Sequence, residues 1–356
     1  MSGRDKPSAA DLVRPSYRRM SLYTSVRAPV ALDLSDNTNQ RGAPPAALAV
    51  AREAGPEVYA RYPSHYGAEL KRALSEWLGV GPEEIVTGCG SDDVPDSAVR
   101  AFAETGDTLA FPEPTFAMLP YFDHMNGLEP KPVPLLGADD GYDIDADGLL
   151  RTNAKIIYIC TPNNPTGTLA SQRSIERVLA EAPGLVVLDE AYIEYASGSL
   201  VRRAKQERRL LVARTLSKAF GMAGLRIGYA VGAPDLVAEV EKSRGPYKIT
   251  ALAETMAVAA LDQDRAWVER GVAEVVDARA PFLRELEALG LAPIPSAANF
   301  VLVPMPGAKA KAAALRERGV AVRPFEALAG FGDALRISIG PREIMQRALD
   351  AMREVL

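Results

Sequence analysis

The sequence predicts an α/β protein in which a large domain holds a mostly parallel sheet covered by helices, and a smaller α+β domain follows. Between about residues 85 and 232, short apolar runs alternate with helical patterns, which is typical of a parallel sheet buried on both faces. After Gly245 and Pro246 the pattern changes to a long helical region and then to short strands. A chain of 356 residues also exceeds the size at which one hydrophobic core usually stops growing.

The strands of the large domain are expected where apolar runs carry no charged residue. These runs are 85–86, 108–111, 156–159, 185–188, 210–212 and 227–231. In the C-terminal part we expect helical structure to about residue 289, strands at 300–303, 320–322 and 335–339, and a terminal helix from Pro341, whose ring suits a first helical turn. The expected division is an N-terminal segment (1–40) that packs with the small domain, a large domain (41–245) and a small domain (246–356).

The amino-acid composition makes some classes of function unlikely for this protein. Apolar residues make up 47% and charged residues 24%, as in ordinary globular proteins. A net charge of −5 gives no basic field for nucleic acid, so a small-molecule ligand fits better. Two cysteines make no disulfide framework, and no apolar targeting or membrane segment is visible, which predicts a cytoplasmic protein without a membrane partner.

A resident metal is not expected. His65 and His124 are the only histidines, so an imidazole cluster for zinc and a Ser-His-Asp hydrolase are both disfavoured. The acidic run 143–148 imitates the start of a calcium loop, but Ala154 stands where the loop needs a bidentate glutamate. We therefore interpret this run as a solvated turn.

Polar residues follow several predicted strands, and in an open parallel sheet ligands bind beyond the carboxyl ends of the strands. The strand at 85–86 leads into a glycine-containing turn with Ser91 and Asp92, which opens a helix and whose N–H groups could hold a phosphate. On its own this turn is equally well explained as a capped helix start. After 156–159, two prolines restrict the backbone around Asn164, although a simple turn would explain them as well.

The next two strands lead to a carboxylate and an amine. Asp189 follows the apolar strand 185–188, and burying its charge is costly unless it meets a cation, in an ion pair of the fold or in a ligand. Lys218 follows 210–212 among small and apolar residues, with Arg226 close behind. Alone it could be a surface lysine. Together with the other strand ends it suggests a Schiff-base lysine for pyridoxal 5′-phosphate.

Several motifs together resemble the fold-type I, pyridoxal-phosphate-dependent aminotransferases of class I and II. They are Arg61-Tyr62-Pro63, residues 90–93, 162–167, 189–194, 215–228 and 335–340. The likeness extends from about Tyr23 to the C-terminus, and within the family it is nearest to the histidinol-phosphate aminotransferases. It implies a seven-stranded sheet in the large domain and a homodimer with shared active sites.

The resemblance also implies roles for individual residues. Lys218 forms the aldimine with the cofactor and acts as the proton shuttle, while Asp189 pairs with the ring nitrogen. The remaining cofactor contacts are Asn164 and Tyr192 on the ring hydroxyl, Phe116 on the ring face, and Ser91, Asp92, Thr215, Ser217, Arg226 and the neighbouring subunit's Tyr62 on the phosphate. Phe116 stands where the family commonly has tyrosine.

For the substrate, the resemblance implies that Arg336 binds an anionic group, with Asn164 beside it, and that Tyr23 and Arg323 contact the phosphate end of histidinol phosphate. The implied reaction is a ping-pong transamination with 2-oxoglutarate, a step of histidine biosynthesis. Lys248 and Gln40 depart from the asparagine and proline common in the family. Transamination of aromatic or other amino acids, decarboxylation of a phosphorylated amino acid, and a non-catalytic cofactor-binding module remain as alternatives.

Overall fold

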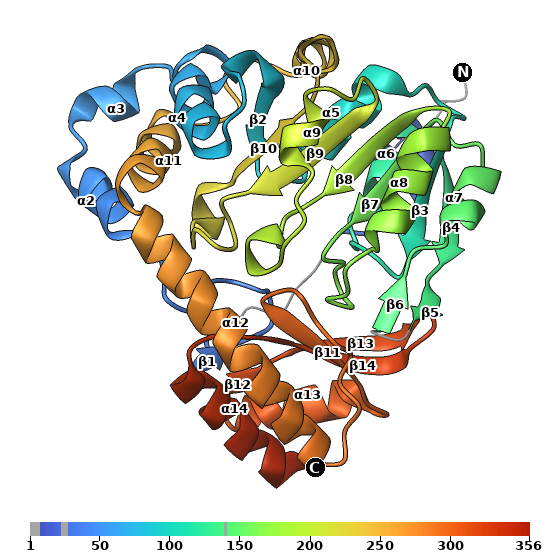
Figure 1. Cartoon of the computed structure of the whole chain (residues 1–356), viewed down its shortest axis with the longest axis vertical. Helices are drawn as coiled ribbons and strands as arrows, with labels where there is room; N and C mark the ends of the chain where they lie inside the picture. Colours follow the sequence, from blue (N-terminus) through green and yellow to red (C-terminus); the bar gives the residue numbers. More distant parts are fainter. Residues whose placement is uncertain (1–7, 23–27, 139–140) are drawn as a thin grey trace, which may run out of the picture.

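A computed structural model describes residues 8–22, 28–138 and 141–356 of the chain. Its main element is a seven-stranded sheet with the order β2-β10-β9-β8-β7-β3-β4 (Figure 1). The strands are β2 (Ile85–Cys89), β3 (Thr108–Glu113), β4 (Glu129–Pro134), β7 (Ile156–Cys160), β8 (Leu185–Asp189), β9 (Leu210–Thr215) and β10 (Ile227–Val231). β10 runs antiparallel to both neighbours, and the other pairs are parallel. The predicted mostly parallel seven-stranded sheet is confirmed.

Helices cover both faces of this sheet, which explains why its strands are apolar without alternation. On β7, Ile157 and Ile159 belong to one apolar cluster, and Ile156 and Tyr158 belong to the other. The first cluster includes α4 (Ala68–Leu78), α7 (Ala146–Arg151), α8 (Gln172–Glu181) and α9 (Val201–Ala204). The second includes α5 (Asp93–Phe102), α6 (Leu119–Asn126) and α10 (Pro234–Lys242).

The edge strand β4 was not among the predicted strands. Its sequence contains Pro130, Pro132 and Pro134, and proline removes a backbone donor from a strand. The prolines alternate with Glu129, Lys131 and Val133, so the missing donors all point away from β3 and toward the open edge. This arrangement preserves the ladder with β3 and leaves no donor on the outer side for another strand to use.

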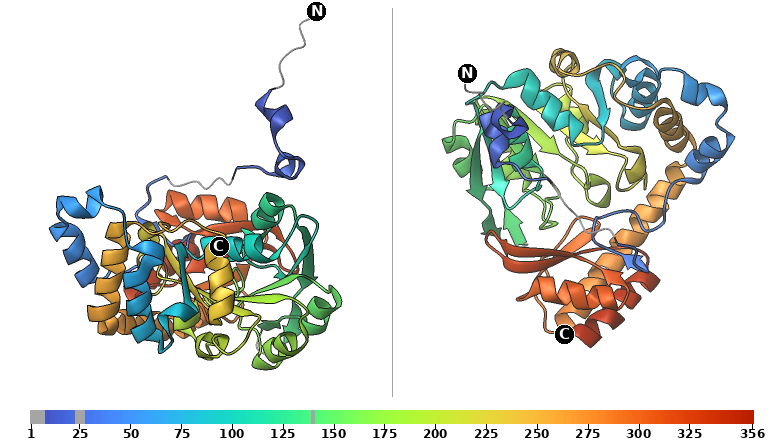
Figure 2. Two further views of the ribbon diagram at one scale, coloured as in Figure 1. Left: turned by 90° about the horizontal axis from the view of Figure 1, so that it is seen from above. Right: turned by 180° about the vertical axis from the view of Figure 1, so that it is seen from behind.

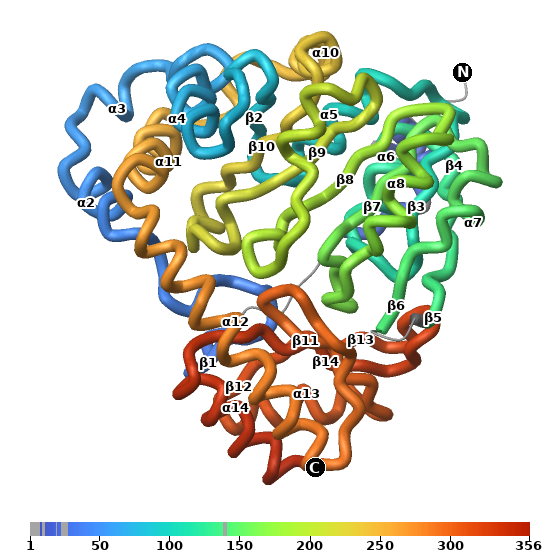
Figure 3. The backbone as a smooth tube through the Cα atoms, in the orientation of Figure 1, coloured from blue at the N-terminus to red at the C-terminus, as the bar shows by residue number. Residues whose placement is uncertain are grey.

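The C-terminal part forms a smaller sheet with helices against it. β11 (Phe300–Pro304), β14 (Gly332–Ser338) and β13 (Arg323–Leu328) are antiparallel in that order. The terminal helix α14 (Arg342–Val355) packs with both α12 (Arg265–Ala288) and α13 (Ala308–Glu317), in the orange and red part of the tube in Figure 3. The smaller α+β domain is thus confirmed as part of the fold class.

The N-terminal segment forms a separate two-stranded sheet with the C-terminal part. β1 (Leu32–Asp33) pairs in parallel with β12 (Val320–Ala321), which occupies most of the predicted strand 320–322. α11 (Ala251–Gln263) packs instead on α2 (Pro45–Glu53) and α4. The predicted domain boundaries at 40/41 and 245/246 stay a prediction, as does the cytoplasmic location.

Further short elements complete the described chain. They are α1 (Ala9–Leu12), η1 (Pro15–Arg19), α3 (Pro56–Ala60), η2 (His65–Gly67), η3 (Pro82–Glu84), β5 (Leu136–Ala138), β6 (Gly141–Asp143), η4 (Ile193–Tyr195) and η5 (Ala223–Leu225). Among residues 8–22, 28–138 and 141–356, no helix combines the length and apolar character that crossing a bilayer requires.

Candidate active site

The polar side chains named from the strand ends meet at one edge of the sheet. The register pairs Cys160 on β7 with Asp189 on β8, and Asp189 with Ala213 on β9. Thr215, at the end of β9, pairs with Gly228 near the start of the antiparallel β10. Loops beyond these positions carry Asn164, Lys218 and Arg226, so the sheet places them beside Asp189.

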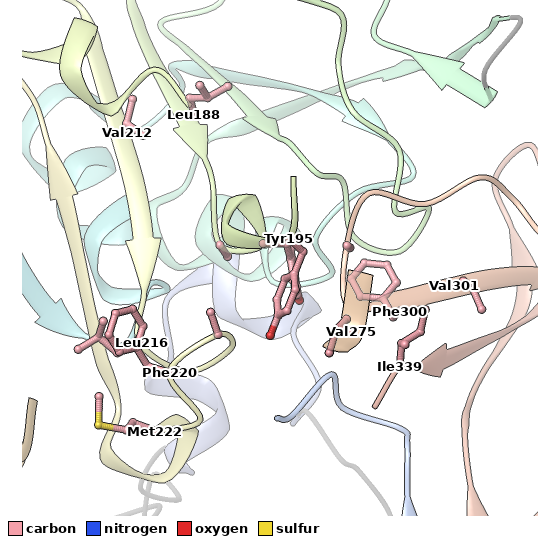
Figure 4. Packing of buried hydrophobic residues seen from close by; sticks show 14 of the residues in the cluster. Leu188, Tyr195, Val212, Leu216, Phe220, Met222, Val275, Phe300, Val301 and Ile339 are labelled. Atoms are coloured by element: carbon pink, nitrogen blue, oxygen red, sulfur yellow. The ribbon is translucent and has the colours of Figure 1, made fainter. Parts of the chain in front are cut away.

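Lys218 lies on the loop after β9, held by apolar neighbours on both sides. Leu216, Phe220 and Met222 are buried and pack into the same core region, as the close view in Figure 4 shows. Gly221 has a φ of +65° and approaches Gly42 so closely that a Cβ there would lie 2.0 Å from the Gly42 carbonyl oxygen. The loop therefore has one tightly fixed path, which holds the base of the lysine side chain.

The amine of Lys218 is chemically unusual for a lysine. Its Nζ donates to the backbone oxygen of Asp36 at 3.2 Å and lies 5.6 Å from the centre of the Tyr192 ring. Burial, assisted by the positive charge of Arg336, lowers the pKa of the Lys218 amine to about 8. A substantial neutral fraction near neutral pH makes the amine a nucleophile toward a carbonyl.

Asp189 is a buried carboxylate without a cation of its own. Its Oδ1 accepts from the Ala191 N–H at 2.9 Å and its Oδ2 accepts from the Tyr158 hydroxyl at 2.5 Å. Desolvation raises the pKa of the Asp189 carboxyl to about 6 despite the hydrogen bonds from Tyr158 and the Ala191 N–H, and no ion pair to Asp189 occurs among the described residues. A ligand carrying a protonated nitrogen would supply the missing charge.

In the turn between β2 and α5, the absence of a side chain at Gly90 lets the Arg226 guanidinium lie against the backbone. A Cβ on Gly90 would lie 2.3 Å from Nη2 of Arg226, and one on Gly228 would lie 2.3 Å from the Ser91 nitrogen. Arg226 Nη2 donates to Asp92 Oδ2 at 3.2 Å. The guanidinium and the helix N-terminus together form a donor set suited to a phosphate.

Two hydroxyl side chains lie at the end of β9 and just after it. Thr215 Oγ1 and Ser217 Oγ are 2.9 Å apart, and the Ser217 N–H donates to Thr215 Oγ1 at 3.1 Å. Both residues are buried. They add neutral donors to the charged ones of the turn.

The small domain contributes Arg336 to the same region. Its Nη1 donates to Asn164 Oδ1 at 2.5 Å and its Nη2 donates to the backbone oxygen of Ser35 at 2.9 Å. Its guanidinium lies over Phe300 at 5.4 Å and over Phe325 at 5.8 Å from the ring centres. Arg323 on β13 is the register partner of Arg336, so two guanidinium-bearing residues lie side by side on the sheet.

Three further residues were named from the sequence. Tyr62 is 81% exposed and stacks on Tyr247 at 4.7 Å between ring centres, on the molecular surface. Phe116 is half-buried and packs against the apolar cluster of α5 and α6. Tyr23 lies outside the described residues.

Sequence reasoning missed Asn37 and Tyr158. Asn37 is 1% exposed and donates from Nδ2 to the Tyr192 hydroxyl at 3.1 Å. Tyr158 holds Asp189, but inside an apolar strand it is indistinguishable from a core residue. A signal for Asn37 exists in the run of small polar residues at 35–39, which follows a short apolar stretch just as the other strand-end residues do.

Comparison with known proteins agrees with this geometry. The family model "Aminotransferase class I and II" matches residues 29–352. The chain is 36% identical to a histidinol-phosphate aminotransferase of Roseiflexus castenholzii, over 98% of this chain and 99% of the relative. It is 39% identical to histidinol-phosphate aminotransferase 1 of Thiobacillus denitrificans, over 91% of this chain and 85% of the relative.

Solved structures show the same architecture. The histidinol-phosphate aminotransferase of Sinorhizobium meliloti in complex with pyridoxal 5′-phosphate aligns with a TM-score of 0.84 at 29% identity, covering 96% of this chain and 97% of that one. An aspartate aminotransferase mutant of Thermus thermophilus aligns with a TM-score of 0.81 at 26% identity, covering 97% and 99%.

The residues of this chain fit the cofactor that these comparisons indicate. A buried carboxylate without a cation, an amine with a lowered pKa and a glycine-lined anion turn are the groups that a pyridinium nitrogen, an aldehyde and a phosphate require. The protein is a pyridoxal-phosphate-dependent transaminase that acts on small molecules. By sequence, fold and cofactor, the chain belongs to the class I and II aminotransferase family.

Proposed function

We propose that this transaminase takes the amino group of histidinol phosphate and passes it to 2-oxoglutarate, forming glutamate. The observation that carries the proposal is the adjacency of Arg336 and Arg323 across β14 and β13, with Arg336 hydrogen-bonded to Asn164. Two guanidinium groups can bind an anion through planar, paired hydrogen bonds, and phosphate and carboxylate both have that geometry. The names of the relatives at 36% and 39% identity support the phosphate ester as the donor.

Each residue at the sheet edge has a proposed task. The turn at Ser91 and Asp92 holds the cofactor phosphate through backbone N–H groups, with Thr215, Ser217 and Arg226. Asn164 and Tyr192 bind the ring hydroxyl, and Phe116 packs on the ring face. Tyr23 and Arg323 bind the far end of the substrate.

The chemistry divides between cofactor and protein. When bound, pyridoxal phosphate supplies an electron-accepting ring for the bond that breaks at the substrate's α-carbon. Asp189 keeps a proton on the ring nitrogen by offering it a buried negative charge. Lys218 would hold the cofactor's carbonyl carbon through Nζ, and as a free amine the same Nζ would move a proton at the substrate's α-carbon. Its lowered pKa leaves it unprotonated often enough to act as that base.

We further propose a homodimer in which Tyr62 reaches the cofactor phosphate of the partner subunit. Tyr62 is 81% exposed, and Leu12 and Leu22 are 73% and 90% exposed. η1 contacts α6, and Arg14 donates to the Met125 carbonyl oxygen, whereas α1 lies outside the body of the molecule in the left view of Figure 2. Apolar side chains on an extended segment favour burial against another subunit.

Mixing two variants tests the shared site. Lys218→Ala and Tyr62→Ala proteins are unfolded together, refolded and assayed. If Tyr62 acts across the interface, hybrid dimers contain one intact site and regain activity. If Tyr62 serves its own subunit, every hybrid site carries one defect and the mixture stays at the level of the parent variants.

A donor panel tests the substrate. The protein loaded with pyridoxal phosphate is mixed separately with histidinol phosphate, histidinol, phenylalanine, tyrosine and glutamate, and loss of the visible absorption band is followed. We expect histidinol phosphate and glutamate to react fastest, and histidinol to react much more slowly because it lacks the phosphate. A faster reaction with an aromatic amino acid would replace the proposed donor, and release of carbon dioxide from a phosphorylated amino acid would indicate a decarboxylase.

The requirement for arginine is tested in the same assay. Arg323→Met should raise KM for histidinol phosphate and leave histidinol unaffected, because only the former carries the anion. Equal losses for both donors would contradict a phosphate-binding role.

A further inference from the structure

Asn37 connects the phenol of Tyr192 to the strand that carries Arg336. Its Nδ2 donates to the Tyr192 oxygen at 3.1 Å, and its own backbone N–H donates to Ser338 Oγ at 3.0 Å. The side chain of Asn299 donates to the Asn37 carbonyl oxygen at 3.0 Å. Ser338 lies two positions beyond Arg336 on β14, so one buried residue contacts both the segment that follows β8 and a strand of the smaller sheet.

The backbone at this position is restricted as well. Asn37 has a φ of +58°, in the left-handed region where glycine, asparagine and aspartate are favoured. Ser338 Oγ also donates to the Leu34 carbonyl at 2.9 Å, which fixes the segment leading into Asn37. Conformation alone would be satisfied by glycine, so it does not account for an amide directed at a phenol.

The direction of the hydrogen bond matters for the chemistry. Asn37 donates and the Tyr192 oxygen accepts, which leaves the phenolic hydrogen for another acceptor. Donation to the oxygen also polarises the O–H bond, because hydrogen bonds in a chain strengthen one another in a buried setting. Tyr192 is 4% exposed, and the centre of its ring lies 5.6 Å from the Lys218 amine, so its hydroxyl belongs to the same buried region.

We propose that Asn37 is a positioning residue that orients the Tyr192 hydroxyl toward the cofactor's ring oxygen and strengthens its hydrogen bond. This inference rests on the proposed role of Tyr192 at the ring hydroxyl. In this role Asn37 acts through the phenol of Tyr192. Its backbone bonds to Ser338 and Asn299 fix that orientation with respect to the strand of Arg336.

The test distinguishes the effect of the Asn37 side-chain amide from the effect of its backbone conformation. Asn37→Gly is compatible with the left-handed φ and with both backbone hydrogen bonds, and it removes the side-chain amide: its donation to Tyr192 and the 3.5 Å contact that its oxygen accepts from Ser338 Oγ. Asn153→Gly is the matched control, because Asn153 also has a positive φ (50°) but lies exposed outside the site. The measured quantity is the pH at which the visible absorption band of the protein with pyridoxal phosphate has changed by half, without substrate. It is measured in wild type, in the two glycine variants, in Tyr192→Phe, and in the double variants that combine each glycine change with Tyr192→Phe.

We expect Asn37→Gly to shift the midpoint in the same direction as Tyr192→Phe by about 0.5 to 1 pH unit, the size that one hydrogen bond accounts for. In the Tyr192→Phe background the same change should shift nothing, and Asn153→Gly should shift nothing in either background. An equal shift with and without the phenol, an opposite shift or no shift would overturn the proposal.

This outcome is independent of the amino donor. If histidinol phosphate fails to react but the shift depends on Tyr192, the proposed substrate is lost and the role of Asn37 stands. If the donor reacts as proposed but Asn37→Gly shifts the midpoint equally with and without the Tyr192 hydroxyl, the role of Asn37 is lost and the proposed function stands.

Discussion

Arg214→Met should destabilise the protein strongly, because Arg214 is the cation of a buried ionic network next to the site. Its Nε and Nη2 donate to Glu190 Oε2 at 3.0 and 2.9 Å. Glu190 is 1% exposed and also accepts from Ser199 Oγ and the Leu200 N–H, both at 2.7 Å. Arg214 Nη1 also lies 3.5 Å from Glu194 Oε1, so removing the arginine leaves two carboxylates without their cation, at a cost of about 3 to 5 kcal/mol.

The network also links two strands at the reacting edge. Glu190 follows Asp189 directly, and Arg214 precedes Thr215 directly. At about 2 °C per kcal/mol for a chain of this size, Arg214→Met should lower Tm by about 6 to 10 °C. Thermal unfolding followed by circular dichroism measures this.

Two further variants test whether the loss of stability comes from the buried charge. Arg203→Met is the matched control, because its ion pairs with Glu176 and Glu207 are partly exposed and should be worth less than about 1 kcal/mol. Adding Glu190→Gln to Arg214→Met should recover part of the loss by neutralising the stranded carboxylate. A fall in Tm no larger than that of the control, or no recovery in the double variant, would refute the assignment of the cost to the buried charge.

Three more expectations concern the site. Lys248→Asn removes the 2.8 Å ion pair with Asp93 at the start of α5, so the Kd for pyridoxal phosphate should rise several-fold; an unchanged Kd in equilibrium titration would contradict this. The rate at which pyridoxal phosphate combines with Lys218 should rise with pH and level off above about 8, since only the neutral amine reacts; in Arg336→Met the midpoint should move upward, and a downward move would be inconsistent with the cause given. Asp189→Asn should lower kcat by roughly 100-fold or more in steady-state assays, and near-normal kcat would exclude its role.

Most strands of the large sheet could be predicted because a strand that is buried on both faces has an unbroken run of apolar residues. β7 and β8, both fully buried, follow this rule. β4 does not, because an edge strand needs donors on one side only and can accept three prolines on the other. Single-sequence patterns treat proline as a strand breaker and cannot know which side of a strand will face a partner.

The site was predictable where its residues follow strands of the parallel sheet. Asn164, Asp189 and Lys218 were found because the fold itself brings strand ends together. Asn37 was not, since its contacts to Tyr192, Ser338 and Asn299 join residues more than 150 positions away in sequence. The run of small polar residues at 35–39 marks the segment, but the contacts that give Asn37 its role are defined by tertiary packing.

The most direct test of the account is to identify the lysine that binds the cofactor. The protein is incubated with pyridoxal phosphate, reduced with sodium borohydride, digested and analysed by mass spectrometry. We predict a single phosphopyridoxyl-modified peptide, with the group on Lys218. Stoichiometric modification of a different lysine, or none under conditions that give the visible absorption band, would contradict the central claim.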